Sequence, residues 1–302
     1  MDLSVIVVSF NTKKLLSDCL FSVYSKTKGI DFEVIVVDND SRDDSPQMVE
    51  ANFPGVVLIK NGQNLGFAAA NNQGLKMAKG RYLLLLNSDT KLIENTLFKM
   101  VQWMDGHKKI GVSSCQLLNQ DETIQATGGF FPTLPRVLAW MMFWDDLPFV
   151  DRVVKPIHPH EPKFYFRHSW YKKEHFQDWV TGAFFLIRRE VVKKVGLLDE
   201  KFFMYVEEME YCYRIQKAGF WVFYSPISKI IHLKGRSGLT RNAVLGEFSG
   251  LKYFFEKHKP GWQKPFLRLL LKTGAALRIF IFGIIKGNSE ARKIYVEAFK
   301  IA

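Results

Sequence analysis

The chain has 302 residues, of which 24% are charged and 47% hydrophobic, a composition typical of a globular protein with a substantial core. Its formal net charge of +12 predicts a polyanionic partner, namely nucleic acid, an anionic membrane or a phosphorylated substrate. Cys19, Cys115 and Cys212 lack the spacing of a zinc site or a disulfide framework, so we expect buried thiols. The first residues predict a strand rather than a signal peptide, and no uncharged apolar stretch reaches the roughly 18 residues that a membrane-spanning helix needs.

An apolar run over residues 82–86 ends abruptly at the polar residues Asn87, Ser88 and Asp89. The run shows no alternation of polar and apolar residues, which predicts a buried strand of a parallel sheet that helices cover on both faces. Ligands of such sheets bind beyond the carboxyl ends of the strands, and a carboxylate oxygen suits Mg²⁺ or Mn²⁺ on a diphosphate. The alternative is that the three polar residues only turn the chain and cap the next helix.

Strand and helix patterns alternate from residue 1 to about 117, which predicts a doubly wound α/β half with a mostly parallel sheet. Asp38 and Asp40 follow the second expected strand, where a carboxylate commonly accepts hydrogen bonds from the ribose or base of a nucleotide. An Asx-rich turn is the alternative for this acidic segment. Beside 82–86, the expected strands of this half are residues 3–8, 32–37, 56–59 and 110–115.

The segment 61–74 combines a run of alanines with Gly66 and Gly74, which predicts a thin helix whose backbone can approach the sheet or a ligand closely. No G-x-G-x-x-G fingerprint follows the first strand, and the chain has no G-x-x-x-x-G-K-[ST] phosphate loop. These two absences count against a Rossmann oxidoreductase and against a P-loop enzyme.

The regular pattern breaks between residues 117 and 178, in a segment rich in proline and tryptophan. A long irregular insertion in a compact domain is typically functional, so we expect a lid or a wall of a binding site. The irregular spacing of four histidines in this segment favours surface histidines over a metal site; they are His158, His160, His168 and His175.

Regular structure returns with an expected strand that begins near Gly182, and later with an amphipathic helix over residues 206–219. Glu207, Glu208 and Glu210 crowd the first turn of this helix. The helix dipole favours acids at this end. Three neighbouring carboxylates nevertheless repel one another, so we expect a basic group, a metal or a proton beside them.

A further expected strand, residues 221–224, leads to Pro226. His232 follows the apolar pair Ile230 and Ile231 and precedes a basic loop that contains Lys234 and Arg236. This position favours a histidine at the end of a strand beside a phosphate group. A purely structural histidine is the alternative.

The segment 264–286 is mostly apolar but contains Arg268, Lys272 and Arg278. This pattern is typical of a helix that lies in a membrane interface and turns its cations toward anionic headgroups. The alternative is a helix that docks against the rest of the protein or against another subunit.

Several of these motifs, taken together and in order across residues 3–236, resemble the family 2 inverting glycosyltransferases with the GT-A fold, in particular the bacterial rhamnosyltransferase-like branch. The insertion and the C-terminal tail lie outside the resemblance. The matching stretches are residues 7–11, 36–39, 64–67, 72–74, 87–89, 181–183, 203–214 and His232.

The resemblance implies that Asp89 and His232 hold a divalent metal, Mg²⁺ or Mn²⁺, on the diphosphate of a sugar nucleotide, and that Asp38 reads the base. It also implies a carboxylate base that takes the proton of the acceptor hydroxyl. The family usually has Glu-Asp at this helix, whereas this chain has Glu207 and Glu208, so Glu208 is the first candidate and Glu207 the second. We further expect donor contacts from Ser9, Asn11, Asp40, Asn64, Gly66, Asn72, Asn87, Ser88, Gly182, Ala183, Lys234 and Arg236.

We therefore expect a metal-dependent inverting transferase that moves L-rhamnose from a dTDP- or UDP-type donor onto a lipid-linked or polysaccharide acceptor in cell-surface glycan synthesis. Galactofuranose or glucose is the alternative sugar. A basic nucleic-acid-binding α/β protein is a weaker alternative, because no helix-turn-helix, RNP or zinc pattern is present. Residues 1–117 should bind the nucleotide sugar, 118–238 the acceptor and catalytic groups, and 239–302 should form a helical extension on the anionic cytoplasmic face of the membrane.

Overall fold

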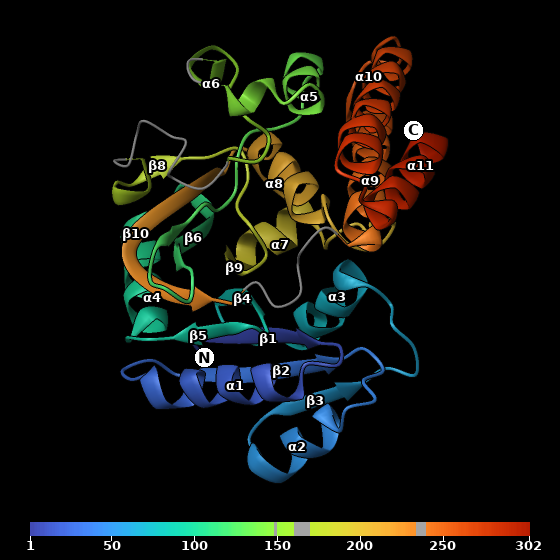
Figure 1. The fold of residues 1–302 in the computed structure, drawn as a ribbon. Helices are drawn as coiled ribbons and strands as arrows, with labels where there is room; N and C mark the ends of the chain where they lie inside the picture. The colour runs from blue at the N-terminus through green and yellow to red at the C-terminus, as the bar shows by residue number, and fades with distance from the viewer. Residues whose placement is uncertain (148–149, 160–169, 234–239) are drawn as a thin grey trace.

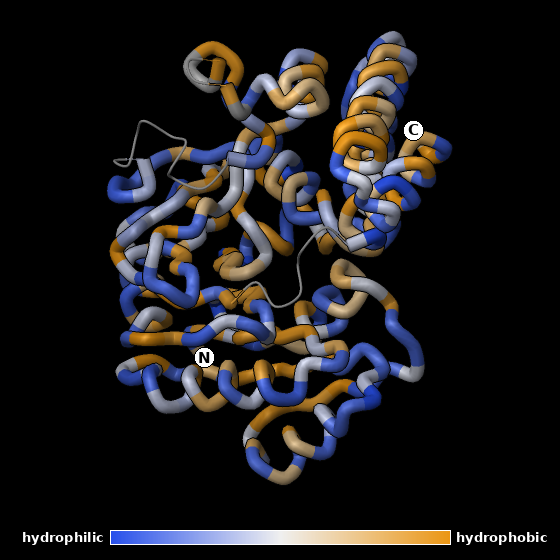
Figure 2. The backbone as a smooth tube through the Cα atoms, viewed as in Figure 1, coloured by the Kyte–Doolittle hydropathy of each residue, from blue (hydrophilic) through white to orange (hydrophobic). Residues whose placement is uncertain are grey.

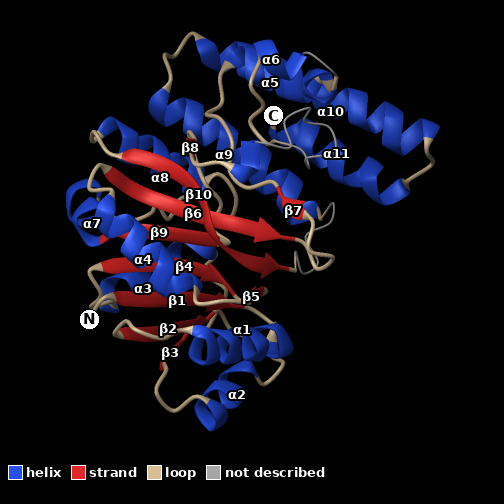
Figure 3. Ribbon diagram, turned by 90° about the vertical axis from the view of Figure 1, so that its left-hand side faces the viewer, coloured by secondary structure: helices blue, strands red, loops and turns tan. Residues whose placement is uncertain are grey.

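The computed structural model describes residues 1–147, 150–159, 170–233 and 240–302 (Figure 1). One sheet crosses the molecule in the order β3-β2-β1-β4-β9-β6-β10-β5, with β7 beside β6 and β8 beside β10 (Figure 3). The strands are β1 (Leu3–Ser9), β2 (Phe32–Asp38), β3 (Val57–Lys60), β4 (Tyr82–Asn87), β5 (Thr90–Leu92), β6 (Ile110–Leu118), β7 (Ile124–Gln125), β8 (His175–Phe176), β9 (Phe184–Arg188) and β10 (Trp221–His232).

Helices lie on both faces of this sheet and gather beyond it at the C-terminal end of the chain (Figure 1). The α-helices are α1 (Lys13–Lys26), α2 (Ser45–Asn52), α3 (Phe67–Met77), α4 (Thr96–Gly106), α5 (Leu134–Met141), α6 (Val150–Val153), α7 (Arg189–Val195), α8 (Glu207–Lys217), α9 (Arg241–His258), α10 (Gln263–Arg278) and α11 (Ser289–Ile301). Two short 3₁₀ turns, η1 (Trp144–Asp146) and η2 (Trp170–Lys172), and a π-helical segment, η3 (Ile279–Ile285), complete the described elements.

β4 is buried on both faces, as its unbroken apolar sequence predicts. Leu83 and Leu85 belong to a core shared with α3, α8 and α9, whereas Tyr82, Leu84 and Leu86 belong to a second core shared with α1, α2 and α4. Because successive residues of a strand point to opposite faces, a strand between two cores needs apolar residues at every position. The same apolar character runs along the neighbouring central strands in Figure 2.

The sheet is mostly parallel, and the predicted α/β architecture is confirmed. β3, β2, β1 and β4 are all parallel neighbours. β9, which comes from the second half of the chain, lies antiparallel between β4 and β6. Strands from both sides of the expected boundary near residue 117 therefore share one sheet.

β10 is longer than the sequence predicts. The expected strand ends at Tyr224, before Pro226, but β10 continues to His232. Its register against β6 shifts between Tyr224 and Lys229, and Pro226 lies within this irregular stretch, where a missing N–H does not break a regular ladder. The continuation pairs His232 with Thr90 of β5, which brings the histidine next to Asp89.

The C-terminal helices are packed into the protein rather than simply appended. Leu267, Leu271 and Ala275 of α10 belong to the core that also contains α8 and α9. Arg278 is only 6% exposed, and its guanidinium donates to the carbonyl oxygens of Met141 (2.8 Å) and Trp140 (2.9 Å) in α5. The expectation that Arg278 faces lipid headgroups is therefore wrong.

Two further expectations from composition can be compared with the structure. All three cysteines are buried free thiols, as predicted. Among the described helices, none combines the length and the apolar character needed to cross a bilayer.

Candidate active site

A cavity of about 500 Å³ opens where the carboxyl ends of β1 and β4 meet the start of α8 and the middle of α9. Parallel strands present their ligands at this edge. The predicted site residues that line it are Asn64, Gly66, Asn87, Ser88, Asp89, Gly182, Ala183, Glu207, Glu208 and His232. Ser9, Asn11, Asp38 and Asp40 lie at or just after the ends of β1 and β2 and do not line the cavity, and Lys234 and Arg236 lie outside the described residues.

Asp89 and His232 face each other across the cavity edge, with 3.3 Å between Asp89 Oδ1 and His232 Nε2. The other ring nitrogen, Nδ1, lies 2.6 Å from Oε1 of Gln125 in β7. An N–H on Nδ1 that donates to this amide leaves the Nε2 lone pair directed toward Asp89. Gln125 comes from the irregular segment, and sequence reasoning missed it because nothing local links it to a histidine more than a hundred residues away.

The donor set at Asp89 and His232 fits a divalent cation that a diphosphate helps to hold. No group of three or more metal-ligating side chains occurs within the described parts of the chain. Mg²⁺ is commonly bound by one or two protein groups together with substrate phosphates and water, and imidazole nitrogen also suits Mn²⁺. One carboxylate and one oriented imidazole on the cavity edge therefore suffice for such a site once the diphosphate is present.

A chain of hydroxyl groups joins the ends of β1 and β4. Ser9 Oγ lies 3.0 Å from Thr12 Oγ1, which donates in turn to Ser88 Oγ at 3.2 Å. Thr12 and Ser88 line the cavity, whereas Ser9 is fully buried beneath them. Ser9 thus supports the cavity floor through Thr12.

Asp38 is 2% exposed, and its two carboxylate oxygens differ in their contacts. Its Oδ1 accepts from Ser41 N at 2.9 Å, while its Oδ2 is buried without a hydrogen-bond partner in the described structure. Asn11, in the left-handed region with φ 54°, accepts from Arg42 N at 2.7 Å and so ties the loop after β1 to the loop after β2. Asp40 is also left-handed, with φ 71°. These loops fix the surroundings of the unpaired Asp38 oxygen.

The asparagines of the 61–74 segment divide into two groups. Asn64 lines the cavity and accepts from Gly66 N (2.9 Å) and from Asn39 Nδ2 (3.2 Å). Asn72 is only 1% exposed, and its amide binds the backbone of Leu198 on both sides. The expected donor contact of Asn72 is therefore corrected: this side chain anchors the 198–200 loop.

Glu208 reaches the cavity beside the backbone of Gly182. Its Oε1 accepts from Gly182 N at 3.2 Å. A Cβ at Gly182 would lie 2.9 Å from Cζ of Phe67, so a larger residue here would require the Phe67 ring to move. The two residues before α8, Tyr205 and Val206, have φ of 72° and 71°, and this strained turn sets the direction of the helix start.

Glu207 differs from Glu208 in its surroundings. Glu207 is 2% exposed, and burial raises the pKa of its carboxyl well above the usual range. The charge of Glu208 and a hydrogen bond between the two side chains raise the Glu207 pKa further. A proton on Glu207 therefore relieves the repulsion of this pair.

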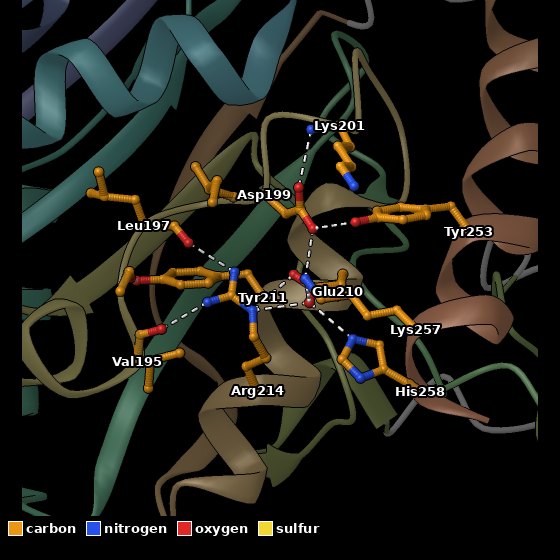
Figure 4. A network of polar contacts seen from close by, with 12 residues as sticks. Val195, Leu197, Asp199, Lys201, Glu210, Tyr211, Arg214, Tyr253, Lys257 and His258 are labelled. Atoms are coloured by element: carbon orange, nitrogen blue, oxygen red, sulfur yellow. Dashed lines mark hydrogen bonds and ion pairs between the residues drawn. The ribbon is translucent and has the colours of Figure 1, made fainter. Parts of the chain in front are cut away.

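Glu210, the third acid of this turn, lies outside the cavity in a network of bases (Figure 4). It is fully buried, and its Oε1 lies 2.9 Å from each of three nitrogen atoms with which it forms hydrogen bonds or ion pairs: Nε of Arg214, Nζ of Lys257 and Nε2 of His258. The expected repulsion at the start of the helix is thus relieved by a proton at one carboxylate and by cations at another.

The cavity lining also contains residues that the sequence did not indicate as site residues: His158, Trp179, Tyr205 and Glu247. His158 forms an ion pair with Glu247 of α9 and remains 34% exposed, so it is a partly exposed histidine of the cavity wall. His175 stacks on Tyr224, with ring centroids 4.8 Å apart. His160 and His168 lie outside the described residues.

The order and directions of the strands are those of the GT-A fold, which solved structures share. The sequence profile of Glycosyl transferase family 2 matches residues 4–196, and the chain belongs to this family.

Two relatives illustrate what this chain is similar to. It is 25% identical over 292 residues, 91% of each chain, to the N-acetylglucosaminyl-diphospho-decaprenol L-rhamnosyltransferase of Mycobacterium tuberculosis. It is 29% identical over 136 residues, 44% of this chain and 52% of the relative, to the Escherichia coli UDP-Glc:alpha-D-GlcNAc-diphosphoundecaprenol beta-1,3-glucosyltransferase WfaP.

Solved structures share the fold at low identity. The mannosyltransferase PcManGT from Pyrobaculum calidifontis, in complex with GDP-Man and Mn²⁺, aligns with a TM-score of 0.59 at 16% identity over 99% of this chain and 86% of its own. GalNAc-T7 with UDP, GalNAc and Mn²⁺ aligns with a TM-score of 0.63 at 18% identity over 99% of this chain and 55% of its own.

Proposed function

We propose that this protein is an inverting glycosyltransferase of cell-surface glycan synthesis that transfers L-rhamnose from a dTDP- or UDP-linked donor to a lipid-linked saccharide. The observation that carries the proposal is that one cavity contains both the Asp89–His232 pair and the carboxylate of Glu208. The two relatives support the acceptor class, because both names specify N-acetylglucosamine on a polyprenyl diphosphate. The acceptor we propose is accordingly an N-acetylglucosaminyl-diphospho-polyprenol.

In the proposed reaction Glu208 is the general base. A neutral hydroxyl is a poor nucleophile, so Glu208 takes its proton as the hydroxyl oxygen bonds to the anomeric carbon of the donor. The bond from that carbon to the phosphate oxygen breaks, and the nucleoside diphosphate leaves with the bonding electrons. One displacement from the opposite face inverts the anomeric centre. Neutral Glu207 contributes by leaving the pair with one charge, carried by Glu208.

The donor half of the cavity suits a nucleoside diphosphate. Asp89 and His232 would hold Mg²⁺ or Mn²⁺, which supplies charge stabilisation to the departing diphosphate when bound. Gln125 keeps the His232 ring oriented for this task. The unpaired Oδ2 of Asp38 suits an N–H of a pyrimidine base. Lys234 and Arg236 are proposed as further diphosphate contacts by their position in the sequence alone.

A donor panel tests the proposal. The purified protein is mixed with a short-chain N-acetylglucosaminyl-diphospho-prenol and with dTDP-rhamnose, UDP-glucose or UDP-galactofuranose, and released nucleoside diphosphate and the glycolipid product are measured. We expect transfer of rhamnose that requires Mn²⁺ or Mg²⁺ and stops in chelator. A preference for UDP-glucose would change the sugar but keep the reaction class. Absence of transfer from every donor would overturn the proposal.

We also propose that the protein binds peripherally to the anionic cytoplasmic face of the membrane through α10 and η3. Their outward side carries large apolar side chains that are each at least 53% exposed: Trp262, Phe266, Leu269, Phe280, Ile284 and Ile285. Exposed cations border them at Arg268, Lys272 and Lys286. Apolar contact combined with cations is the chemistry by which a helix lies in a lipid interface. We call this set the outer face of α10–η3.

A further inference from the structure

The cavity wall beside Glu208 contains an ion pair to which the proposed reaction gives no role. His158 comes from the irregular segment, and Glu247 comes from the middle of α9. Both side chains line the cavity and remain partly exposed there, 34% for His158 and 23% for Glu247. Glu247 lies beyond residue 196, where the match to the family profile ends, whereas His158 lies within the match.

Contacts with Trp179 and Trp140 hold the backbone and the ring of His158 in place. Trp179 Nε1 donates to the carbonyl oxygen of Ile157 at 3.2 Å, which fixes the backbone next to the histidine. The imidazole also contacts the rings of Trp179 and Trp140, with centroids 5.5 Å away in each case. A Cβ at Gly129 would lie 2.0 Å from the same carbonyl oxygen, so only glycine leaves room for this arrangement. The pair is therefore a built part of the wall.

The pair is ionic despite its partial burial. Burial opposes a charge on His158, but the charge of Glu247 and its hydrogen bond more than offset this, and Asp145 and Glu208 act in the same direction, so the pKa of His158 is raised. Arg278 of α10 also interacts electrostatically with Glu247. An imidazolium and a carboxylate at a cavity wall keep free valences for hydroxyl groups, because a carboxylate accepts several hydrogen bonds and an imidazolium donates two.

The position of the pair relative to Glu208 indicates what it binds. In a direct displacement the acceptor enters opposite the departing diphosphate, whose place Asp89 and His232 mark. The residues of α9 on either side of Glu247 pack against the turn just before α8: a Cβ at Gly246 would lie 2.8 Å from the carbonyl oxygen of Met204, and one at Gly250 would lie 2.8 Å from Val206. The pair therefore lies on the side of the base, where the acceptor hydroxyl must arrive. Building on the proposed function, we infer that Glu247, held by His158, binds hydroxyl groups of the acceptor sugar and selects that sugar.

The test compares Glu247→Gln with Glu256→Gln, an exposed position on the same helix that serves as the matched control. Glutamine keeps the shape of Glu247 but loses its charge-assisted hydrogen bonds. We expect the KM for the N-acetylglucosaminyl-diphospho-prenol to rise roughly 10- to 100-fold in Glu247→Gln, with kcat changed only a few-fold. The affinity for dTDP or UDP with Mn²⁺ should remain that of the wild type. His158→Gln should behave like Glu247→Gln.

Direct binding separates this inference from the proposed function. The same acceptor lipid is titrated into the wild type and into Glu247→Gln, each loaded with dTDP or UDP and Mn²⁺. Equal affinity in both proteins, or no binding in the wild type, would overturn the acceptor subsite. A joint loss of nucleotide affinity and melting temperature would also overturn it, because it would show a merely structural pair. Acceptor binding without transfer from any donor would count against the proposed reaction instead.

Discussion

Glu207 and Glu208 are adjacent in sequence and chemically alike, yet their surroundings give them different protonation states. Both line the cavity, but Glu207 is only 2% exposed, whereas Glu208 is less deeply buried and accepts a backbone hydrogen bond from Gly182. Low-dielectric surroundings favour a neutral acid, and a hydrogen bond to a carboxylate favours its charge. The difference leads to two separate predictions.

Glu208→Gln should retain nucleotide binding and lose transfer by roughly two to four orders of magnitude, because glutamine is nearly isosteric but takes no proton. The measurement is kcat for sugar transfer beside a calorimetric titration of dTDP or UDP. Glu207→Gln is the companion variant and should remain active. If Glu207→Gln is inactive and Glu208→Gln is mild, the two roles are reversed.

Glu207→Gln should also raise the melting temperature more at pH 8 than at pH 5. The unfolded chain releases this proton near pH 4.5, while the folded protein retains it to a much higher pH. From about pH 4.5 upward the unfolded state thus binds fewer protons, so the free energy of unfolding of the wild type falls as pH rises. Glutamine removes this cost. A difference in melting temperature that is the same at both pH values would contradict the assignment, and Glu256→Gln provides the exposed control.

At the residue level, sequence reasoning succeeded where a motif was local. Asp89 directly follows a buried strand, and Glu208 begins an amphipathic helix, so each could be named from its neighbours and lines the cavity. Gln125, His158 and Glu247 could not be found in this way, since each gains its place only through contacts with distant parts of the chain. The donor contact predicted for Asn72 was wrong because the sequence does not show whether an asparagine in a thin helix binds a ligand or the backbone of a loop.

Among the elements, α8 and α9 are joined by buried charges rather than by apolar contacts alone. Glu210 of α8 meets Lys257 and His258 of α9, and Asp199 adds contacts to Lys257 and Tyr253 (Figure 4). α9 therefore holds α8, the helix that carries the proposed base, in place.

Glu210→Ala should destabilise the protein by about 1–3 kcal/mol, because Arg214, Lys257 and His258 lose the buried carboxylate to which they are bonded. Chemical denaturation of the variant measures this free energy of unfolding. Glu256→Ala on the exposed side of α9 should change it by less than about 0.5 kcal/mol. Equal, small effects of both substitutions would show that apolar packing alone holds α9 in place.

The helices and central strands could be predicted because their apolar patterns are local. The extension of β10 beyond Pro226 could not, since the register shift against β6 that accommodates the proline depends on a partner strand. The antiparallel direction of β9 could not be predicted either, because a buried strand is apolar along its whole length whichever way it runs in the sheet. The buried position of Arg278 could not be predicted, because its hydrogen-bond partners are carbonyl groups of α5, which is distant in the sequence.

For the molecule as a whole, the proposed membrane surface and the proposed acceptor wall lie on neighbouring C-terminal helices. α9 supplies Glu247 to the cavity, and α10 packs on both α9 and α5 while its outer face stays exposed. Binding of that face to a bilayer would hold the cavity in a fixed orientation toward a lipid-linked acceptor.

Replacing Trp262, Phe266 and Leu269 together by serine should release the protein from anionic vesicles without lowering its melting temperature, because all three side chains are largely exposed. Vesicle sedimentation measures the bound fraction. Each cation near an anionic surface contributes on the order of 1 kcal/mol, so added salt should weaken wild-type binding as well. Point substitutions are preferable to removing the tail, whose buried residues belong to the core.

The control for vesicle binding is Phe21→Ser in α1, a side chain that is 68% exposed on a different element. This variant should sediment with vesicles as the wild type does. Full sedimentation of the triple variant would instead assign the outer face of α10–η3 to a protein contact.

The antiparallel β9 also bears on how the protein is made. A ribosome releases β1, β2, β3 and β4 first, yet the free edge of β4 finds its partner only when residues 184–188 have emerged. Until then nearly two-thirds of the chain has been made while the backbone N–H and C=O groups on this edge of β4 lack their partner strand, and an unpaired edge favours mispairing. A nascent chain whose translation is stopped before β9 should therefore aggregate. A nascent chain stopped after the C-terminal helices should instead resist protease.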